Sequence, residues 1–475
     1  MACFGRYHSI AYHHPCRKPH HPCQPTMALT PVTSLLNNLG LDRVLTERVR
    51  VVSTATTVDL SNPNFILYLP TVNLRTQHNP AFSLACHFAN QFQVPLLVLC
   101  TVLDDAHHNL SARDEAADEE TFPIVGTARR LCFQLQLLQK VCAEWQNHGC
   151  SVAIRVHGPS CRRPHHLTLA RQSAITITDE PFVHPYRNYV QSVAKASKVC
   201  FCVDGSTTVP PLAKLRPLPD GSFDGVPPKA WMWRKKMEGD LQRNVRAVVD
   251  QGVFDAPPLR DECRAKNLSW KLPQHPLYSR LPKEWKDVSV AAPGERAWTV
   301  DELSAIDPYK WSMKWPGIDT TVAPCRQTDG SKGWERWQKF KRFHLAAYAK
   351  NRNNIRLPHA VSRLSCFLNV GAVSIFQIVH ELWKDKCHTE KFEDEIIKWR
   401  EISYAHAFST PHYFGLAALP DWSRAYLEDC MKRGGQVYSL KDLCLSQTND
   451  STWNAMQTYL RETGELHNNA RMTWG

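Results

Sequence analysis

Two serines three residues apart lie in the segment VSRLSCFLNVGAVS, residues 361–374. Serine hydroxyls and the free N–H groups at a helix start can together bind a phosphate. Ser-x-x-Ser is also common where a serine side chain caps a helix by accepting a hydrogen bond from the backbone of the first turn. The spacing of Ser362 and Ser365 alone favours the helix cap, and a phosphate site is the alternative.

The elements that would position such a site begin with an α/β pattern over residues 48–205. Short apolar runs alternate there with helix-like stretches at 79–92, 127–147 and 184–197, which is typical of a parallel sheet covered on both faces. We expect a doubly wound, five-stranded parallel sheet. Its predicted strands are residues 65–70, 95–103, 151–156, 174–179 and 199–204.

Ligand signals in this α/β domain are weak. The first predicted strand is followed by PTVNLRTQHNP instead of G-x-G-x-x-G, so ordinary dinucleotide binding has no support. Asp179 and Glu180 stand at the carboxyl end of the fourth predicted strand, where ligands of α/β sheets usually bind. Capping of a neighbouring loop is an equally good interpretation of these two carboxylates.

Three further regions complete the chain. Residues 1–47 are expected to be a disordered or targeting tail, because Asp and Glu are almost absent while Arg, Lys and His are frequent. Residues 206–330 are rich in proline and indicate a connector, with one short helix expected behind Thr299. Residues 331–475 have helical spacing, so we expect an all-α C-terminal domain whose last long helix is interrupted near Gly464.

The composition narrows the class of partner. The chain has 475 residues and a formal net charge of +12, which favours a polyanionic partner without choosing between DNA, RNA and a membrane surface. The longest apolar runs are far shorter than the ~20 residues that cross a bilayer, so we expect no membrane-spanning helix.

The 17 cysteines follow no framework, and we expect buried thiols without essential disulfides. The segment HHPCRKPHHPC has metal-ligand residue types but irregular spacing, and we expect no metal site.

Three later segments carry a family resemblance. NRNNIRLPHAVSRLSCFLNVGAVS (351–374), KWREISYAHAF (398–408) and HNNARM (467–472) resemble motifs of the photolyase/cryptochrome family, and the last two resemble its class II branch. The similarity runs from about residue 48 to the end of the sequence and is strongest in the C-terminal region. It implies an α/β domain joined to an all-α FAD-binding domain.

The resemblance also implies which residues bind FAD. The serine pair would hold its diphosphate, so the resemblance supports the phosphate interpretation of these two hydroxyls. Arg400 would lie against the flavin, and its alternative is a salt bridge to Glu401 or Asp421. An antenna chromophore in the α/β domain is a further implied ligand. The implied cofactor-binding residues are Ser362, Leu364, Ser365, Arg400, Asn468 and Arg471.

The implied catalytic residues are Glu395, Trp453 and Trp474. The carboxyl of Glu395 would hydrogen-bond the damaged bases, and the two tryptophans would relay electrons to photo-excited flavin. Trp399 and Met472 would border the substrate. The alternatives are a solvated acidic turn for Glu395 and ordinary packing for the aromatic residues and the methionine.

The implied function is light-dependent splitting of cyclobutane pyrimidine dimers in DNA by electron transfer from reduced FAD, which is a carbon–carbon lyase reaction. Val361, Cys366 and Val370 replace residues of the family pattern, and the family continues beyond the last residue of this sequence. A C-terminally truncated or divergent homologue is therefore expected. A cryptochrome-like photoreceptor without repair activity and a degenerate, non-catalytic homologue are the alternatives.

Dimer-containing DNA is the implied partner, and we expect no membrane contact. Lys339, Lys341 and Arg342 are candidates for binding its phosphates, although a solvated helix face explains the three cations equally simply. We expect a monomer located in the nucleus or in an organelle.

Overall fold

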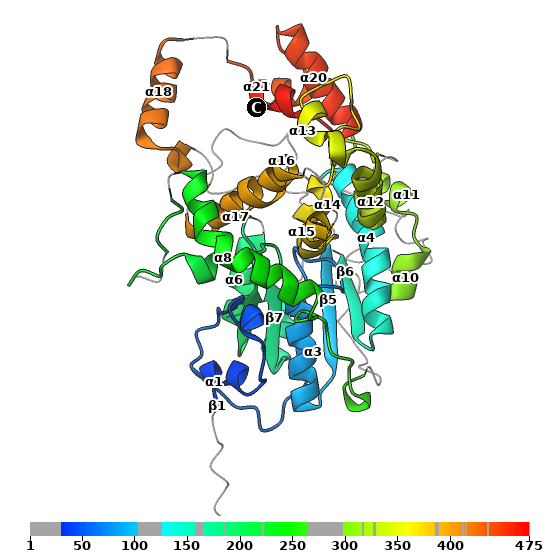
Figure 1. The fold of residues 1–475 in the computed structure, drawn as a ribbon. Helices are drawn as coiled ribbons and strands as arrows, with labels where there is room; N and C mark the ends of the chain where they lie inside the picture. Colours follow the sequence, from blue (N-terminus) through cyan, green and yellow to red (C-terminus); the bar gives the residue numbers. More distant parts are fainter. Residues whose placement is uncertain are drawn as a thin grey trace, which may run out of the picture.

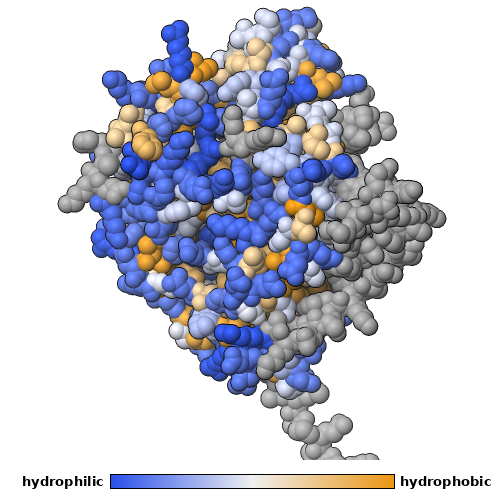
Figure 2. Space-filling view, turned by 90° about the vertical axis from the view of Figure 1, so that its right-hand side faces the viewer, coloured by the Kyte–Doolittle hydropathy of each residue, from blue (hydrophilic) through white to orange (hydrophobic). Residues whose placement is uncertain are grey.

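The computed structural model describes residues 30–102, 126–156, 165–184, 186–219, 223–227, 229–264, 298–315, 318–325, 329–384, 389–410, 413, 416–434 and 437–474. The strands of the main sheet lie in the lower half of Figure 1, and the last two helices lie at its top. Among these residues, no helix combines the length and the apolar character that a bilayer crossing requires. On the face seen in Figure 2, hydrophobic residues form small separate patches among hydrophilic ones.

A six-stranded sheet forms the centre of the α/β domain, in the order β2-β8-β7-β4-β5-β6. The five predicted strands are confirmed, and the pairings among them are parallel. The predicted number is wrong by one, because β2 (Val49–Val51) adds an antiparallel edge to β8, and a three-residue strand is too short to show periodicity. The predicted strands are β4 (Ile66–Leu69), β5 (Leu96–Val102), β6 (Ser151–Val156), β7 (Ile175–Asp179) and β8 (Cys200–Val203).

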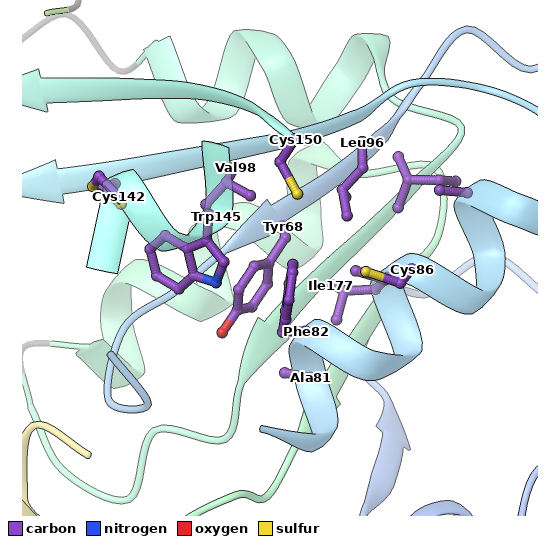
Figure 3. Packing of buried hydrophobic residues seen from close by; sticks show 14 of the residues in the cluster. Tyr68, Ala81, Phe82, Cys86, Leu96, Val98, Cys142, Trp145, Cys150 and Ile177 are labelled. Atoms are coloured by element: carbon purple, nitrogen blue, oxygen red, sulfur yellow. Dashed lines mark hydrogen bonds between the residues drawn. The ribbon is translucent and has the colours of Figure 1, made fainter. Parts of the chain in front are cut away.

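Helices cover both faces of this sheet, as predicted. Side chains alternate along β4, so that Tyr68 faces one core and Leu67 the other. In the larger core Tyr68 packs against Phe82 and Trp145, with ring centroids 6.1 and 5.9 Å away (Figure 3). The covering helices are α3 (Pro80–Phe92) and α4 (Ala128–Asn147) on this side, and α5 (His165–Gln172) and α6 (Tyr186–Ala196) on the other.

The strand order reverses between β4 and β7, and Asp179 ties the ends of these two strands together. Its buried carboxylate accepts hydrogen bonds from the backbone N–H groups of Thr71, Val72 and Asn73, at 2.6, 3.0 and 3.2 Å. Burial raises the pKa of Asp179, although these hydrogen bonds act in the opposite direction. The loop-capping interpretation of Asp179 is therefore confirmed, whereas Glu180 forms a two-pronged ion pair with the arginine of β2.

Parts of the predicted tail and connector are folded. Residues 30–47 form a strand and two helices with buried Val32 and Leu45, which corrects the expectation of a disordered or targeting tail for this stretch; residues 1–29 lie outside the described part. A 20-residue helix, α8 (Ala230–Val249), lies within the predicted connector and packs against α15 (Ile375–Lys384). The helix expected behind Thr299 is α10. The remaining elements are β1 (Thr30–Pro31), α1 (Val32–Asn37), α2 (Arg43–Thr46), β3 (Thr57–Val58), α7 (Pro211–Lys214), η3 (Asp261–Cys263), α10 (Val300–Ala305) and α11 (Pro308–Lys314).

The described elements after residue 330 are helical, as predicted. Trp337 and Phe340 of α12 pack with Phe392 in a core that α8 shares. α20 ends at Gly464, which has φ +74° and lies where the sequence predicted an interruption. The elements are η5 (Gly330–Lys332), α12 (Gly333–Phe343), η6 (Leu345–Ala347), α13 (Tyr348–Asn351), α14 (Ser365–Asn369), α15, α16 (Glu390–Glu393), the π-helical turn η7 (Asp394–Trp399), α17 (Arg400–Ser409), η8 (Leu416–Ala418), α18 (Asp421–Lys432), α19 (Leu440–Leu445), α20 (Ser451–Thr463) and α21 (Asn468–Trp474).

One glycine determines how the two domains meet. Gly371 has φ +67°, and its carbonyl oxygen accepts a hydrogen bond from Arg75 Nη1 at 2.9 Å. The neighbouring carbonyl of Val370 accepts one from the backbone N–H of Leu74 at 3.0 Å. A Cβ at position 371 would lie 2.3 Å from the carbonyl oxygen of Val72. The loop after β4 and the segment after α14 are therefore in direct backbone contact, which no side chain at position 371 would permit.

Candidate functional site

A cavity of about 1270 Å³ lies between the α/β domain and the C-terminal helices. It is larger than the roughly 300–1,000 Å³ of most small-molecule pockets. The α/β domain contributes the loops after β4 and β7 and the first turns of α4, and the helical domain contributes α14 with the residues before it and the junction of α20 and α21. A cavity of this size suits an extended ligand rather than a single small ring.

The serine pair of the sequence motif lines this cavity. α14 begins at Ser365, its N-cap residue is the buried Leu364, and no side chain caps the helix. The helix-cap interpretation is therefore wrong for both Ser362 and Ser365. The described residues give neither hydroxyl a hydrogen-bond partner, so both are available to a ligand. Burial raises the pKa of the adjacent Cys366 thiol to about 11, which leaves it uncharged at neutral pH.

The segment 464–471, at the end of α20 and the start of α21, lines another side of the cavity. We call this segment the 464–471 wall. Asn468 Oδ1 accepts a hydrogen bond from Arg471 Nη2 at 3.0 Å. Glu465 forms an ion pair with Arg363, which lies between the two serines, at 2.9 Å. The structure thus brings together at one cavity the predicted cofactor residues Ser362, Leu364, Ser365, Asn468 and Arg471.

Helix α4 adds residues that sequence reasoning missed. Arg129, Arg130, Phe133 and Gln134 line the cavity from its first two turns. Cations are disfavoured in the first turn of a helix, where the backbone dipole is positive, and α4 has no acidic residue there to offset them. Two arginines at an unfavourable helix position indicate, from the sequence alone, that their side chains bind groups outside their own helix.

The chemistry of the lining favours an anionic ligand. Its single acidic residue, Glu465, is engaged by Arg363. Two buried polar atoms of the lining, Thr71 Oγ1 and His467 Nε2, have no hydrogen-bond partner in the described part of the chain, and such atoms are costly unless a ligand or water meets them. The five arginines of the lining are Arg129, Arg130, Arg336, Arg363 and Arg471.

Arg400 lies in α17 and is not among the lining residues. Neither of its two expected salt bridges forms: Glu401 accepts hydrogen bonds from Thr208 instead, and Asp421 pairs with the arginine three residues further on. The guanidinium of Arg400 lies over the ring of Tyr404, 4.6 Å from its centroid. Its Nη1 is buried without a hydrogen-bond partner among the described residues, so one cationic nitrogen remains for another group.

Glu395 stands apart from the cavity lining. It lies on the π-helical turn η7 and pairs with Arg352 and Lys391, each at 2.9 Å. The alternative of a freely solvated acidic turn is therefore wrong, because the carboxylate is held by two cations. Its role toward damaged bases stays a prediction.

The other predicted catalytic and substrate residues do not line the cavity either. Trp399 is 48% exposed and donates from Nε1 to Asp394 at 3.2 Å. Met472 is 74% exposed on α21, and Trp453 is half-buried in the first turn of α20. Trp474 is the last residue of α21, and its side chain lies outside the described part. The relay and the substrate wall stay predictions.

Apart from Cys366, the described cysteines do not line the cavity. No group of three or more His, Cys, Asp or Glu that could hold a metal occurs among the residues that the structure describes, and HHPCRKPHHPC lies outside them. Cys100, Cys200 and Cys202 are buried free thiols, as predicted. Burial raises the pKa of Cys200 to about 12, which makes it a poor nucleophile.

Comparison with known proteins finds relatives along most of the chain, although no family model matches it. Over 135 residues the chain is 33% identical to the deoxyribodipyrimidine photo-lyase of Arabidopsis thaliana and 28% identical to that of Oryza sativa subsp. japonica, and each match covers 27% of either protein. A 414-residue match of 20% identity to the deoxyribodipyrimidine photo-lyase of Methanothermobacter thermautotrophicus covers 87% of this chain and 77% of the relative. These relatives support the resemblance of the chain to the photolyase/cryptochrome family.

The family resemblance of the sequence motifs is thereby confirmed, and its class II branch stays a prediction. The chain matches about a quarter of the length of the two plant photo-lyases. Among solved structures, an archaeal photolyase from Sulfolobus tokodaii with two FAD molecules aligns with a TM-score of 0.43 and 11% identity, over 86% of this chain and 73% of that one.

Proposed function

We propose that the cavity binds FAD and that the chain is a light-dependent DNA-repair flavoprotein that splits cyclobutane pyrimidine dimers. One observation carries the cofactor assignment: two serine hydroxyls without partners among the described residues line a large cavity that also holds five arginines. A diphosphate matches such hydroxyls and charges. The adenine and flavin rings need the space that this cavity offers. The relatives named as photo-lyases support the reaction.

Four of the predicted cofactor residues would have a defined role in this cavity, and Arg400 would act from outside its lining. Ser362 and Ser365, with the N–H groups at the start of α14, would bind the diphosphate. Asn468 and Arg471 would contact the flavin from α21, and Arg400 would offer its unpaired guanidinium nitrogen from α17. When bound, reduced FAD supplies the photo-excited electron that opens the cyclobutane ring. The protein would contribute orientation, exclusion of water and a pocket for the flipped-out dimer.

The surface of α12 supports DNA as the partner. Arg342 lies 5.0 Å from the ring centroid of Phe343, which is 60% exposed. A cation beside an exposed aromatic ring suits a phosphate and an unstacked base. Lys341, in contrast, is engaged by Glu381 at 2.9 Å. We therefore propose that Lys339, Arg342 and Phe343, rather than Lys341, contact DNA.

A photoreceptor without repair activity is the second candidate. Glu395, the predicted contact to the damaged bases, is held by Arg352 and Lys391 and does not line the cavity. Both cations meet Oε1, so a dimer would have to be met by the other oxygen, from a residue outside the cavity lining. Flavin binding would be unaffected, because none of the proposed diphosphate contacts involves Glu395.

Titration of the purified chain with FAD, followed by flavin fluorescence and blue-light absorbance, tests the cofactor. We expect the double variant Ser362→Ala/Ser365→Ala to bind FAD at least about tenfold more weakly, because two hydrogen bonds to a charged group are lost. Ser192→Ala is the matched control, since its exposed hydroxyl only bonds the backbone of its own helix α6. This control should bind FAD like the wild type.

A repair assay then separates the two candidate functions. The reduced protein is mixed with an oligonucleotide containing one cyclobutane thymine dimer and kept under blue light or in the dark. Loss of the dimer only in the light supports the repair enzyme. Flavin binding without repair favours the photoreceptor. No flavin binding after reconstitution contradicts both and favours a non-catalytic homologue.

A further inference from the structure

The 464–471 wall of the cavity is held by little packing. α20, which leads into it, buries none of its residues. Within the wall, Ala470 is the single buried residue. Segments with so few buried contacts open easily unless other interactions hold them. Polar contacts must therefore determine where this wall stands.

One of these contacts comes from the α/β domain, through Arg129 at the start of α4. Its Nη2 donates to the carbonyl oxygens of Arg461 and Glu462, at 2.7 and 2.8 Å, and its Nε donates to the carbonyl of Ala323 at 3.0 Å. Carbonyl groups in the last turn of a helix lack intrahelical donors and form the negative end of the helix dipole. The side chain also packs against Gly464, where an added Cβ would lie 3.1 Å from Arg129 Nη1.

Two further polar contacts hold the wall from within the helical domain. Arg363 pairs with Glu465 at 2.9 Å, and Asn469 Nδ2 donates to the carbonyl oxygen of Asn353 at 3.1 Å. Among the hydrogen bonds and ion pairs of the described residues, only those of Arg129 join the α/β domain to α20 and the wall. Arg129 thus connects two faces of the cavity, one from each domain.

We propose that Arg129 is a positioning residue, which joins α4 to the end of α20 and so sets the place of Asn468 and Arg471 in the cavity. The inference rests on the proposed function for the identity of the ligand, FAD. Arg129 need not touch FAD in this role. Its planar fork suits this role because three different nitrogens of the guanidinium donate to four carbonyl oxygens, whereas a lysine ammonium has all its donors on one nitrogen.

Hydrogen–deuterium exchange of the ligand-free full chain tests this contact without FAD. We expect Arg129→Ala to raise the exchange rate of the amides in residues 464–471 about tenfold, because the bonds that hold the end of α20 are lost. Arg129→Lys should give an intermediate rate, since it keeps the charge without the fork. Arg243→Ala is the matched control: Arg243 forms ion pairs with Glu47 and Asp240, outside the cavity lining, and exchange in the wall should not change.

FAD titration of the same variants tests the consequence for binding. We expect about tenfold weaker binding in Arg129→Ala and unchanged binding in Arg243→Ala. Unchanged exchange in residues 464–471 of Arg129→Ala overturns the contact, and raised exchange with unchanged FAD affinity overturns the positioning role. If Arg129→Ala does not fold, Arg129→Lys carries both measurements. If the wild type does not bind FAD, the proposed function fails, and the exchange experiment alone decides whether Arg129 holds the wall.

Discussion

Helices α3 and α20 have the same length, 13 residues, and similar ends. The side chains of Asn79 and Asp450 cap them by accepting hydrogen bonds from two backbone N–H groups each. Both helices end at a residue in the left-handed conformation, Gln93 in α3 and Gly464 in α20. Nevertheless α3 buries nine of its residues, whereas α20 buries none.

The difference lies in what surrounds each helix. α3 lies against the main sheet, and α20 lies at the opposite end of the molecule in Figure 1. Capping residues can start and end a helix, but burial of an apolar face supplies most of its stability in a folded protein. The predicted contacts of Asn468 and Arg471 thus lie next to a helix without buried residues, which a bound ligand would help to hold in place.

The largest expected effect is in the core beneath α3. Phe82 is 1% exposed and packs against Tyr68 and Trp145, so Phe82→Ala should lower the free energy of unfolding by about 3–5 kcal/mol. Tyr459→Ala in α20, where the side chain is 46% exposed, should cost less than about 1 kcal/mol. Urea unfolding followed by circular dichroism measures both, and equal losses would break the comparison.

The domain joint should show the next largest effect. Gly371→Ala should cost about 2–4 kcal/mol, because it combines a strained positive φ with a Cβ that would lie 2.3 Å from the carbonyl oxygen of Val72. Gly434→Ala is the matched control, since its φ of +75° is similar but an added Cβ meets nothing within 4 Å. Strain alone should cost the control about 1 kcal/mol.

Thermal unfolding of the two glycine variants measures the difference. The joint between the domains is backbone against backbone, so neither side can yield by turning a side chain. A loss at position 371 no larger than that at position 434 would mean that the domains move apart at little cost. The 464–471 wall would then not be the weakly held part of the cavity. The low burial of α20 compared with α3 would no longer explain which part of the cavity a ligand orders.

The fold is predictable from sequence where burial is continuous. Strands that are buried on both faces must be apolar along their length, so the five parallel strands appear as apolar runs. β2 has only three residues, of which Val51 is 36% exposed, and no run marks it. α8 is missed because charged residues separate its buried positions and prolines are frequent on either side; those positions are Trp233, Met237, Asn244, Val245, Ala247 and Val248.

The site is predictable only in part, for a physical reason. The motif around Ser362 and the one around Asn468 each lie in one short segment, and the resemblance placed both at the cofactor. Arg129 reaches the cavity through the packing of α4 against the helical domain, which no local pattern encodes. The ion pair between Glu395 and Arg352 likewise depends on the backbone of η7 and on a residue of another segment.

The smallest expected effect is at the cap of α20. Asp450→Ala removes hydrogen bonds from the backbone N–H groups of Thr452 and Trp453, at 2.8 and 2.9 Å, and should cost about 1 kcal/mol. Asn79→Ala should cost more, because the buried Asn79 amide also donates to the hydroxyl of Tyr68 at 3.0 Å and unpaired buried groups add their own penalty.

Urea unfolding of both variants, with hydrogen exchange of the first turn of each helix, measures these two losses. Asp450→Asn keeps a capping oxygen and should restore most of the stability. In Asp450→Ala the faster exchange should extend along α20, since no buried residue stops the fraying. In Asn79→Ala it should stay in the first turn, because the following turns of α3 are buried. Similar fraying in both helices would show that their caps, and not their burial, determine how firmly they are held.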